Sequence, residues 1–570
     1  MMQRNRCAGP VVTSRMEILS RALCLVLAFL CCTKLAGAQC RFSPDRAHRE
    51  ITYRFRTEVT PYGLILHVTL ETQTEPSGQL LLKLPSHWAG EQLHTVSNLR
   101  PVTLGATLAD GEDATSKLLH ARPGRPVVVA FDVTKDWSGA LVYPKQFHPV
   151  LLPTYLEFTG SNALVQPEQP DSADVVTNFD WQGLPPGWSL ATSFGASAAG
   201  ESLKTKCQSV LGPWREIDQG LYAAGDYRID RFEINGKPAV LAVRGIWGFT
   251  DEQAIKSLQE IIGTVRSFWH DNNFPYFLVT LKPYDQDRGS SDGSAFTHAF
   301  WMYLSKEDSF NTLLSQLAHE AFHEWNAKRM GSMSGTADRE TEWFHEGFTD
   351  YYGHLLVYRS GAESRDTYVK SLNRDLARFD ANANAYIRGR VIALWLDGII
   401  REESGGKHSL DDVMFDMVRG AKQPLTRQRI LETVRPYITA EDDQLLARAA
   451  ARDAGVPTPP HAPWVGACEQ AASIDQPTYD LGFDLNASKV KMEVIGVTDG
   501  GPAYVAGLRN GQTLKGWSVV SDPDKLASVS VETEAGTKKL TFYPRGKPVN
   551  VWQYLPDEAH PCEAASSPGR

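Results

Sequence analysis

The sequence predicts a multidomain α+β protein with a β-rich N-terminal domain, a central domain of mixed α and β structure, and a small C-terminal domain. Three observations support this prediction. The chain has 570 residues, more than one hydrophobic core accommodates, so about three domains are expected. Apolar and polar residues alternate over residues 41–245, whereas apolar residues recur at helical spacing in several segments between 250 and 454. Residues 456–475 are rich in proline and predict a linker before the last domain, 476–555.

Composition and charge exclude one class of partner. The chain carries 58 Lys and Arg against 67 Asp and Glu, a formal net charge of -9, and it has no basic run. Proteins that bind nucleic acid generally carry a basic patch or stripe. We therefore expect no nucleic-acid partner.

Residues 1–38 have the pattern of a secretory signal peptide. Arginines precede the apolar run 22–32, and Ala36-Gly37-Ala38 has the small residues of a cleavage site. The apolar run is too short for a comfortable membrane span, and no later stretch reaches the roughly 20 apolar residues that a span needs. We expect an exported protein, periplasmic or secreted, with no stable membrane span after cleavage. An uncleaved N-terminal anchor and a lipoprotein modified at Cys40 are the alternatives.

The cysteines also favour export. Outside the predicted signal peptide the chain keeps an even number of them with no metal-type spacing, namely Cys40, Cys207, Cys468 and Cys562. Three disulfide connectivities are possible. We expect Cys40 to pair with Cys207, which would tie the ends of the first domain together, and Cys468 to pair with Cys562, which bracket the last domain. Four unpaired thiols are the alternative.

The N-terminal domain, 40–244, is predicted to be β-sandwich-like. Segments such as 51–56 and 64–70 alternate apolar and polar residues with a period of two, and turn residues separate them. This region shows no catalytic constellation.

The next domain, 245–455, opens with a different pattern. Thr250 and Gln253 have the spacing of a capping box at the start of a helix. Residues 276–281 then predict a strand, and Phe310, Leu313, Leu314 and Leu317 predict an amphipathic helix that continues into the chemically most informative part of the chain.

That helix carries two histidines four residues apart. His319 and His323 therefore project from one face and can bind one metal ion, while Glu320 flanks the space in front of the ion. Glu346 on the following helix supplies a third ligand. Asp350, four residues later on the same helix face, can accept the other ring N–H of His319 and fix its metal-binding tautomer. The pattern predicts one Zn²⁺ per chain with Glu320 as general base, hence hydrolysis of amide bonds.

The runs His319-Glu320-x-x-His323-x-Trp-Asn and Trp343-Phe-x-Glu346-Gly-Phe-Thr resemble the hallmark of the glycyl aminopeptidase family of zinc metallopeptidases. The resemblance implies a gluzincin with an N-terminal β domain, a thermolysin-like zinc peptidase domain and a C-terminal PDZ domain. It also implies an aminopeptidase that acts on peptide substrates and prefers small N-terminal residues such as glycine.

The family has a Tyr-x-Lys-Gly pattern that this sequence matches at Tyr386, with Arg388 in place of the lysine. By that match, Tyr386 would donate a hydrogen bond to the oxyanion of the tetrahedral intermediate. A tyrosine packed at a helix start is the alternative, and Tyr351 or Tyr352 would then take the role.

The sequence departs from the family where the substrate amine should be held. The family pattern Gly-Leu-Glu-His aligns with a stretch that has Thr297 in place of the glutamate, followed by His298. A neutral hydroxyl does not form the charge-assisted bond that fixes an ammonium group. Four acidic residues could stand in: Asp287, Asp292, Glu340 and Glu342.

The activity is therefore predicted with alternatives. An aminopeptidase is the first expectation, and an endopeptidase or dipeptide hydrolase is the second. A PDZ peptide-binding protein with an idle zinc site is a third, but the presence of Glu320 argues against it, since a structural zinc site has no use for a base.

Residues 476–555 resemble a PDZ domain. Leu481, Gly482 and Phe483 match its carboxylate-binding loop, and Gly507 and Leu508 match its helix-to-strand corner. Backbone N–H groups in such a loop hold the carboxylate of a peptide C-terminus while the peptide adds as a strand. Peptide C-termini are thus expected partners, and a PDZ-like cap without a ligand is the alternative.

Overall fold

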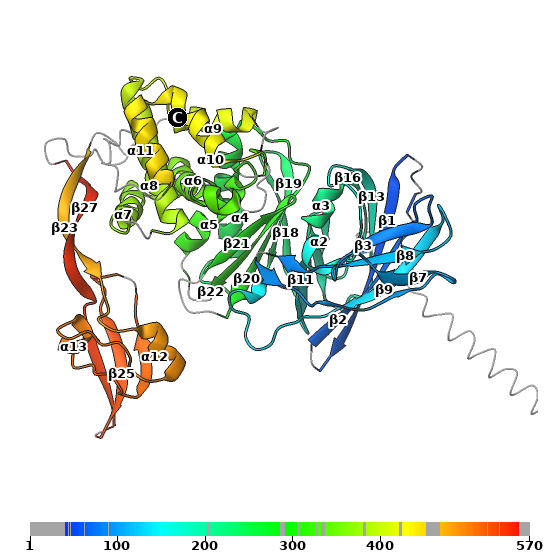
Figure 1. The fold of residues 1–570 in the computed structure, drawn as a ribbon, viewed down its shortest axis with the longest axis horizontal. Helices are drawn as coiled ribbons and strands as arrows, with labels where there is room; N and C mark the ends of the chain where they lie inside the picture. Colours follow the sequence, from blue (N-terminus) through cyan, green and yellow to red (C-terminus); the bar gives the residue numbers. More distant parts are fainter. Residues whose placement is uncertain are drawn as a thin grey trace, which may run out of the picture. The chain divides into compact units, whose positions relative to one another are not determined.

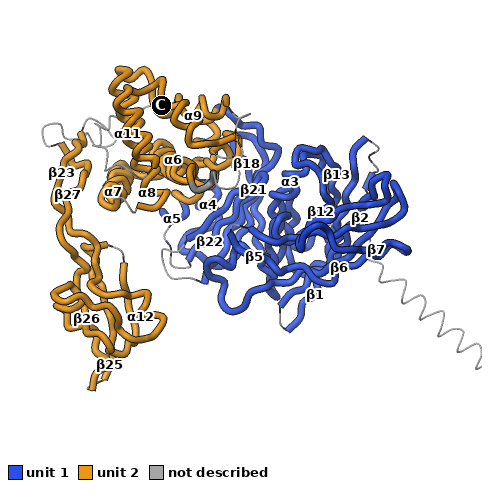
Figure 2. Tube along the Cα trace, viewed as in Figure 1, with its two compact units in different colours: residues 1–259, 270–313 blue, residues 260–269, 314–570 orange. Residues whose placement is uncertain are grey.

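The computed structural model divides into two compact units, coloured separately in Figure 2. It describes residues 40, 42–43, 45, 47–61, 63–88, 90–201, 206–285, 291–305, 308, 310–326, 328–331, 337–379, 383–420, 424–451, 468–520, 522–534 and 536–557, without the side chains of 337–339. Unit 1 comprises the chain up to 259 together with 270–313, and unit 2 comprises 260–269 and the chain from 314 onward. The predicted signal peptide and Cys562 lie outside the described residues.

Unit 1 begins with three β-sheets of four or more strands (Figure 1), besides the two-stranded pair of β4 His87–Trp88 and β5 Glu91–Gln92. The six-stranded sheet contains, in spatial order, β16 Cys207–Pro213, β13 Asp174–Gln182, β1 Arg49–Thr60, β2 Gly63–Gln73, β9 Pro126–Val133 and β6 Val96–Pro101. The four-stranded sheet contains β12 Gln166–Pro167, β3 Gln79–Lys83, β8 Ser116–His120 and β7 Thr107–Asp110. The five-stranded sheet contains β10 Val150–Leu152, β11 Tyr155–Thr159, β17 Leu221–Gly225, β14 Ser189–Thr192 and β15 Gly195–Ser197.

These three sheets share one hydrophobic core. Its centre is aromatic: Phe55 on β1 lies opposite Trp181 on the parallel strand β13, and the two rings stack with centroids 4.2 Å apart. Phe158 on β11 packs against the same tryptophan from the second sheet. The alternating pattern of β2, with every second residue buried, is the period-two signal that predicted strands here. The prediction of a β-rich N-terminal region is confirmed.

A fourth sheet of unit 1 precedes the helices. It contains β18 Arg228–Ile234, β19 Lys237–Val243, β20 Phe277–Tyr284, β22 Ala299–Ser305 and β21 Asp292–Phe296. β19 and β20 run parallel, joined by α4 Asp251–Phe268, whose N-terminus carries the predicted capping box. This sheet therefore starts before residue 245, the predicted domain boundary, because the βαβ unit needs β19 as its first strand.

A buried ion pair lies where the fourth sheet packs against the third. Lys282 on β20 donates to Glu157 on β11, and neither side chain is exposed by more than 4%. Thr280 and Tyr303 also donate to the Glu157 carboxylate, each at 3.1 Å. Burying two charges is tolerated here because every oxygen of the carboxylate has donors.

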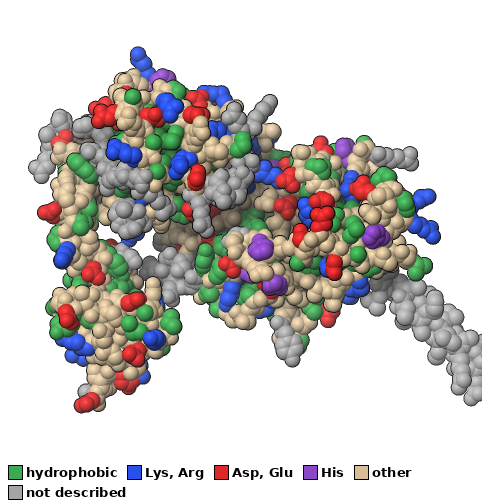
Figure 3. Space-filling view, in the orientation of Figure 1, with side chains coloured by type: hydrophobic (Ala, Val, Ile, Leu, Met, Phe, Trp, Pro, Cys, Tyr) green, Lys and Arg blue, Asp and Glu red, His purple; other side chains and the backbone are tan. Residues whose placement is uncertain are grey.

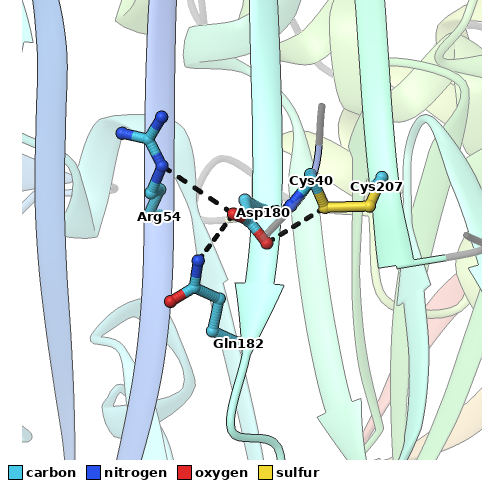
Figure 4. Close-up of a disulfide and its surroundings, with 5 residues drawn as sticks. All are labelled: Cys40, Arg54, Asp180, Gln182 and Cys207. Atoms are coloured by element: carbon cyan, nitrogen blue, oxygen red, sulfur yellow. Dashed lines mark hydrogen bonds and ion pairs between the residues drawn. A yellow bond between two sulfur atoms is a disulfide. The ribbon is translucent and has the colours of Figure 1, made fainter. Parts of the chain in front are cut away.

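The predicted disulfide between Cys40 and Cys207 is confirmed (Figure 4). It joins the start of the described chain to β16, across 167 positions of sequence. Asp180, paired with Cys207 across β13 and β16, lies beside the bridge and accepts from Gln182 Nε2 at 2.7 Å. The predicted partner of Cys468, Cys562, is outside the described residues, so that pairing stays a prediction.

Unit 2 is a helical lobe followed by a β-ribbon and a small α+β domain (Figure 1). Its helices are α6 Ala337–Ser360, α7 Arg365–Leu376, α8 Ala385–Glu403, α9 Leu410–Arg419, α10 Arg427–Val434 and α11 Ala440–Ala450. The N-cap side chains of α7, α8, α9, α10 and α11 accept from the first turn of each helix. α5, Phe310–Phe322, begins in unit 1 and ends in unit 2, as α4 does.

Two long strands, β23 Glu469–Tyr479 and β27 Arg545–Pro556, form an antiparallel ribbon. Residues 469–475, which the sequence assigns to a linker, are the first part of β23. The amide of Asn373 on α7 pairs with both backbone groups of Tyr554 on β27, each hydrogen bond measuring 2.8 Å. This contact anchors the ribbon to the helical lobe.

Between the two ribbon strands, the chain forms a small domain with its own hydrophobic core. Its elements are α12 Leu485–Lys491, α13 Pro502–Val505, β24 Leu514–Ser518, β25 Ala527–Thr533 and β26 Gly536–Phe542. α12 follows directly after the predicted carboxylate-binding loop.

Among the residues described, no helix is both long and apolar enough to cross a membrane. Acidic and basic side chains are interspersed on the face drawn in Figure 3. That mixture agrees with the absence of a basic run in the sequence.

Candidate metal centre

The C-terminal end of α5 positions two imidazoles. His319 lies in the last turn of the helix, and His323 is one residue beyond its end. The backbone N–H of His323 still donates to the carbonyl of His319 at 3.3 Å, so the helical spacing continues for one more turn. The two rings consequently face the same side, with centroids 4.6 Å apart.

α6 brings a carboxylate to the two imidazoles. His319 Nε2 and His323 Nε2 lie 3.0 Å apart, and Glu346 Oε2 lies 3.4 Å from the first and 3.5 Å from the second. Atoms bound at about 2.0–2.1 Å to one tetrahedral ion are separated by about 3.3 Å. The three ligand atoms thus have the spacing and the chemistry that zinc requires, with a fourth position left for a water or a substrate.

The other ring nitrogens of the histidines also have partners on α6. His319 Nδ1 lies 3.6 Å from Asp350 Oδ1, and His323 Nδ1 lies 3.5 Å from Thr349 Oγ1. Polar partners at Nδ1 favour the tautomer that presents Nε2 to a metal. The role predicted for Asp350 therefore has a counterpart at the second histidine that the sequence analysis did not identify.

A fully buried asparagine ties α5 to α6 at this point. Asn326 donates through its amide nitrogen to the carbonyls of Phe344 and His345, both at 3.2 Å, and to Thr349 Oγ1 at 3.0 Å. Phe344 and His345 immediately precede the ligand Glu346. The asparagine of the His-Glu-x-x-His-x-Trp-Asn run therefore holds the backbone that carries the third ligand against the end of α5.

Glycines allow the helices to approach closely around the site. A Cβ on Gly353 would lie 3.2 Å from the backbone nitrogen of His319, so α6 passes directly over the ligand-bearing turn of α5. A Cβ on Gly389 of α8 would lie 1.7 Å from the carbonyl oxygen of Trp343, and one on Gly347 would lie 2.3 Å from the Cα of Gly389. α6 and α8 therefore cross in backbone contact, next to Glu346.

Glu320 and Tyr386 flank the ligand group. Glu320 is 5% exposed, and its Oε2 has no hydrogen-bond partner among the described residues. Tyr386, in the first turn of α8, is 43% exposed and places its ring 5.9 Å from that of His319. An unpaired carboxylate oxygen inside a protein is costly, so Glu320 is available to a partner that the described residues do not supply.

The charges of the site are arranged for a cation. Burial would raise the pKa of Glu346, but His323 and His319 outweigh it and hold that pKa well below its usual range. Burial likewise opposes ionisation of Asp350, yet the hydrogen bond from His319 and the charge of Arg390 lower its pKa. Burial and the nearby Glu346 raise the pKa of Tyr386, so its hydroxyl keeps a proton to donate.

The two tyrosines considered as substitutes for Tyr386 are placed otherwise. Tyr351 and Tyr352 are fully buried and donate to Asp397 at 2.9 Å and to Asp411 at 2.8 Å. These bonds join α6 to α8 and α9. Tyr386 is therefore the tyrosine that lies at the ligand group.

The predicted substrate-binding residues belong to unit 1, whereas the metal ligands belong to unit 2. Thr297 and His298 form the turn between β21 and β22, where His298 has a left-handed φ of 49°. The backbone N–H of Thr297 donates to the carbonyl of Gln219 at 2.9 Å. Their part in binding stays a prediction.

The proposed stand-ins for the family glutamate have varied positions. Asp292 accepts from Gln146, and Glu340 and Glu342 are exposed. Asp287 is outside the described residues.

The predicted carboxylate-binding loop lies in the C-terminal domain. Gly482 has a left-handed φ of 71°, its N–H donates to Asp480 Oδ1 at 2.7 Å, and its carbonyl accepts from Thr498 N at 2.8 Å. Phe483 is buried in the core of this domain, and Leu481 packs against it. One of the loop's N–H groups is thus used by the protein's own carboxylate.

A second cluster of potential metal ligands contains Cys40, Asp180 and Cys207. Both sulfurs belong to the disulfide, so neither is a thiolate that could bind a metal.

Sequence reasoning missed residues whose signal is weak. Arg390 directly precedes the apolar run 391–396 on α8, and a charge beside such a run suggests a buried partner, yet the partner cannot be identified without the fold. His345, whose Nδ1 lies 3.2 Å from Glu346 Oε1, gives no signal beyond its position next to a ligand.

Comparisons with known proteins agree with this geometry. Residues 312–390 match the model of the M61 glycyl aminopeptidase family, a segment that holds all three ligands together with Glu320, Asp350 and Tyr386. No match was found among curated proteins.

Several solved structures are similar. An aminopeptidase N family protein from Idiomarina loihiensis has a TM-score of 0.66 and 18% sequence identity, covering 88% of this chain and 98% of that chain. An M1 zinc metallopeptidase from Deinococcus radiodurans has a TM-score of 0.48 and 16% identity, covering 72% of this chain and 95% of that chain. Yeast LTA4 hydrolase in complex with bestatin has a TM-score of 0.42 and 14% identity, covering 73% of this chain and 69% of that chain. The first of these shows that the chain shares that protein's fold.

Proposed function

We propose that this protein, a zinc metallopeptidase by its ligand group and by the family match over residues 312–390, is an exported aminopeptidase that removes small N-terminal residues such as glycine from peptides. One observation carries the proposal. The buried Glu320 carboxylate, beside the group His319, His323 and Glu346, has one oxygen without a hydrogen-bond partner among the described residues, and a structural zinc site has no need of such a base.

The residues of the chain have distinct roles. His319, His323 and Glu346 would hold the zinc ion, which when bound lowers the pKa of a water ligand to about 7 and polarises a carbonyl group. Glu320 accepts the proton of the attacking water and passes it to the amine that leaves. The hydroxyl of Tyr386 donates a hydrogen bond to the oxyanion that forms from the carbonyl.

The removal of single N-terminal residues is supported by the description of the matched family. Holding a free α-amine requires that its ammonium group donate a charge-assisted hydrogen bond to an acidic group, or several hydrogen bonds to neutral acceptors. Since Thr297 replaces the glutamate of the family pattern, another group of this chain must supply that contact. The endopeptidase alternative follows if none does.

A peptide library distinguishes these activities. The zinc-loaded mature protein is incubated with mixed peptides, half of them N-terminally acetylated, and the products are identified by mass spectrometry. Loss of single N-terminal residues from the free peptides alone is expected. Internal cuts in both halves would make the protein an endopeptidase, and cleavage that persists in Glu320→Gln would exclude the proposed mechanism.

Export is supported by the disulfide between Cys40 and Cys207, since disulfides persist in oxidising compartments. The predicted signal peptide and cleavage after Ala38 give a mature chain that begins at Gln39. Cell fractionation followed by N-terminal sequencing tests the proposal. A chain found in the cytosol with its first residues intact would refute it.

The PDZ assignment of residues 476–555 belongs to the same proposal. Its support is the left-handed Gly482 in the loop Leu481-Gly482-Phe483, a conformation that glycine adopts without strain. Peptides with a free or an amidated C-terminus are titrated into the full-length protein. Binding of the free form alone is expected if peptide C-termini are partners, and equal binding of both forms, or of neither, would remove that role.

A further inference from the structure

Asp350 contacts two different partners through its two oxygens. Its Oδ1 lies 3.6 Å from His319 Nδ1, and its Oδ2 lies 3.5 Å from Nη1 of Arg390. The side chain of Arg390 is 4% exposed, whereas that of Asp350 is 26% exposed. The carboxylate therefore stands between a metal ligand and a buried cation.

Arg390 is itself held in place from α7. Nη1 donates to Asp375 Oδ2 at 2.6 Å, and Nη2 donates to Ser371 Oγ at 2.6 Å. The guanidinium is planar and rigid, so these two short hydrogen bonds fix its orientation and with it the position of Nη1. Nη1 consequently lies between Asp375 on α7 and Asp350 on α6, so one side chain on α8 connects the two other helices.

Asp350 has a competing partner on its own helix. His354, one turn later, places Nε2 3.9 Å from the same Oδ1 that faces His319. A carboxylate that is held at one oxygen only can rotate, and rotation would exchange His319 for His354 or for solvent. The contact at Oδ2 opposes that rotation because it anchors the second oxygen.

We propose that Arg390 is a positioning residue of the zinc site, which fixes Asp350 toward His319 and thereby strengthens zinc binding. The oriented carboxylate keeps the proton of His319 on Nδ1 and leaves Nε2 free for the metal. The inference rests on the zinc-site assignment and is independent of which peptide bond the enzyme cleaves.

The zinc dissociation constant measured by competition with a chelator tests the proposal without any activity assay. Arg390→Gln is expected to weaken zinc binding about 10- to 100-fold, the loss typical of outer partners of metal ligands. Arg388→Gln is the matched control, because Arg388 lies on the same helix, is 1% exposed and donates to the carbonyl of Ala449 at 3.1 Å. Both variants lose a buried guanidinium, but only the first should lose zinc affinity.

Coupling with Asp350 separates positioning from a general loss of structure. In a double-mutant cycle, the protein with both Arg390→Gln and Asp350→Asn should bind zinc no more weakly than Asp350→Asn alone. Either change by itself already removes the same contact between Arg390 and Asp350. Additive losses, or wild-type affinity in Arg390→Gln, would overturn the proposal.

A conservative variant covers the case in which Arg390→Gln does not fold. Arg390→Lys keeps the charge but cannot bond Asp375, Ser371 and Asp350 at once. It should bind zinc more weakly than the wild type, and unchanged affinity would show that the guanidinium geometry is not needed. A zinc-loaded wild-type protein that cleaves no peptide would instead count against the proposed function alone.

Discussion

The close crossing of α6 and α8 leads to a quantitative prediction for Gly389→Ala. A Cβ at this position would lie 1.7 Å from the carbonyl oxygen of Trp343, which falls 1.3 Å short of the 3.0 Å below which Cβ contacts are essentially never found. The three nearest atoms all belong to the backbone of Trp343 and Gly347, so no rotamer change relieves the clash and the helices must separate. Overpacking of this kind costs typically about 1–3 kcal/mol and occasionally more, against about 1 kcal/mol gained from replacing a helical glycine.

We therefore expect Gly389→Ala to lower the free energy of unfolding by about 2 kcal/mol, because a clash of this depth belongs at the upper end of that range. The separation also moves Tyr386, three residues earlier on α8, relative to Glu346 on α6. A displacement of about 1 Å at an active site can reduce kcat roughly 100-fold.

Urea unfolding of the metal-free protein and steady-state kinetics on a peptide substrate measure the two effects. Gly353→Ala is the control, because its Cβ would lie 3.2 Å from the nearest atom, a contact that small shifts can absorb. We expect its stability to stay within about 1 kcal/mol of the wild type, since the helical gain offsets the tight contact. Wild-type stability and wild-type kcat in Gly389→Ala would refute the claim that backbone contact sets this crossing.

Four further substitutions test other parts of the structure. Glu320→Gln should reduce kcat/KM by about 10²–10⁴-fold while the protein still binds one zinc ion, as measured by metal analysis, and undiminished activity would contradict its role as base. Tyr386→Phe should lower kcat about 10²–10³-fold with little change in KM, and an equal rise in KM would point to substrate binding instead. Asn326→Ala should lower the free energy of unfolding by about 2–3 kcal/mol because buried acceptors lose their donor, and a loss below about 0.5 kcal/mol in urea unfolding would be incompatible with this tie. Lys282→Met should cost about 3–5 kcal/mol, and the double variant with Glu157→Leu should recover much of it, since the single change leaves a buried carboxylate without its cation.

Site residues that are close together in the sequence could be predicted, whereas those brought together by packing of distant helices could not. His319 and His323 were found because helical spacing alone places them on one face, and Glu320 because it adjoins the first of them. Glu346 and Asp350 were found because a zinc site needs a third ligand and a spacing of four residues places both carboxylates on one face of the next helix. Thr349 and Arg390 could not be assigned, because their contacts arise only when α6 crosses α5 and α8.

The fold was predictable to a similar depth. Alternation identified the strands of the N-terminal region, and Thr250 with Gln253 identified the start of α4. The domain boundary predicted at 245 did not match the sheet. The change from strand to helix periodicity suggested a new domain there, but β19 before the helix pairs with β20 after it. Pairing between distant strands is set by tertiary packing, and local pattern carries no record of it.

The contact between Asn373 and Tyr554 gives the C-terminal ribbon an attachment that does not depend on the ribbon's own side chain at that point. An amide that bonds one backbone N–H and one backbone carbonyl imitates an adjacent strand, so these two hydrogen bonds do not involve the side chain of residue 554. The helical lobe contacts the other strand of the ribbon as well, because Arg365 Nε on α7 lies 3.9 Å from Glu469 Oε1 on β23. Replacing the two strands and the domain between them by another ribbon-borne domain would therefore require Asn373 and Arg365 on α7 to be retained, with an acidic residue at position 469.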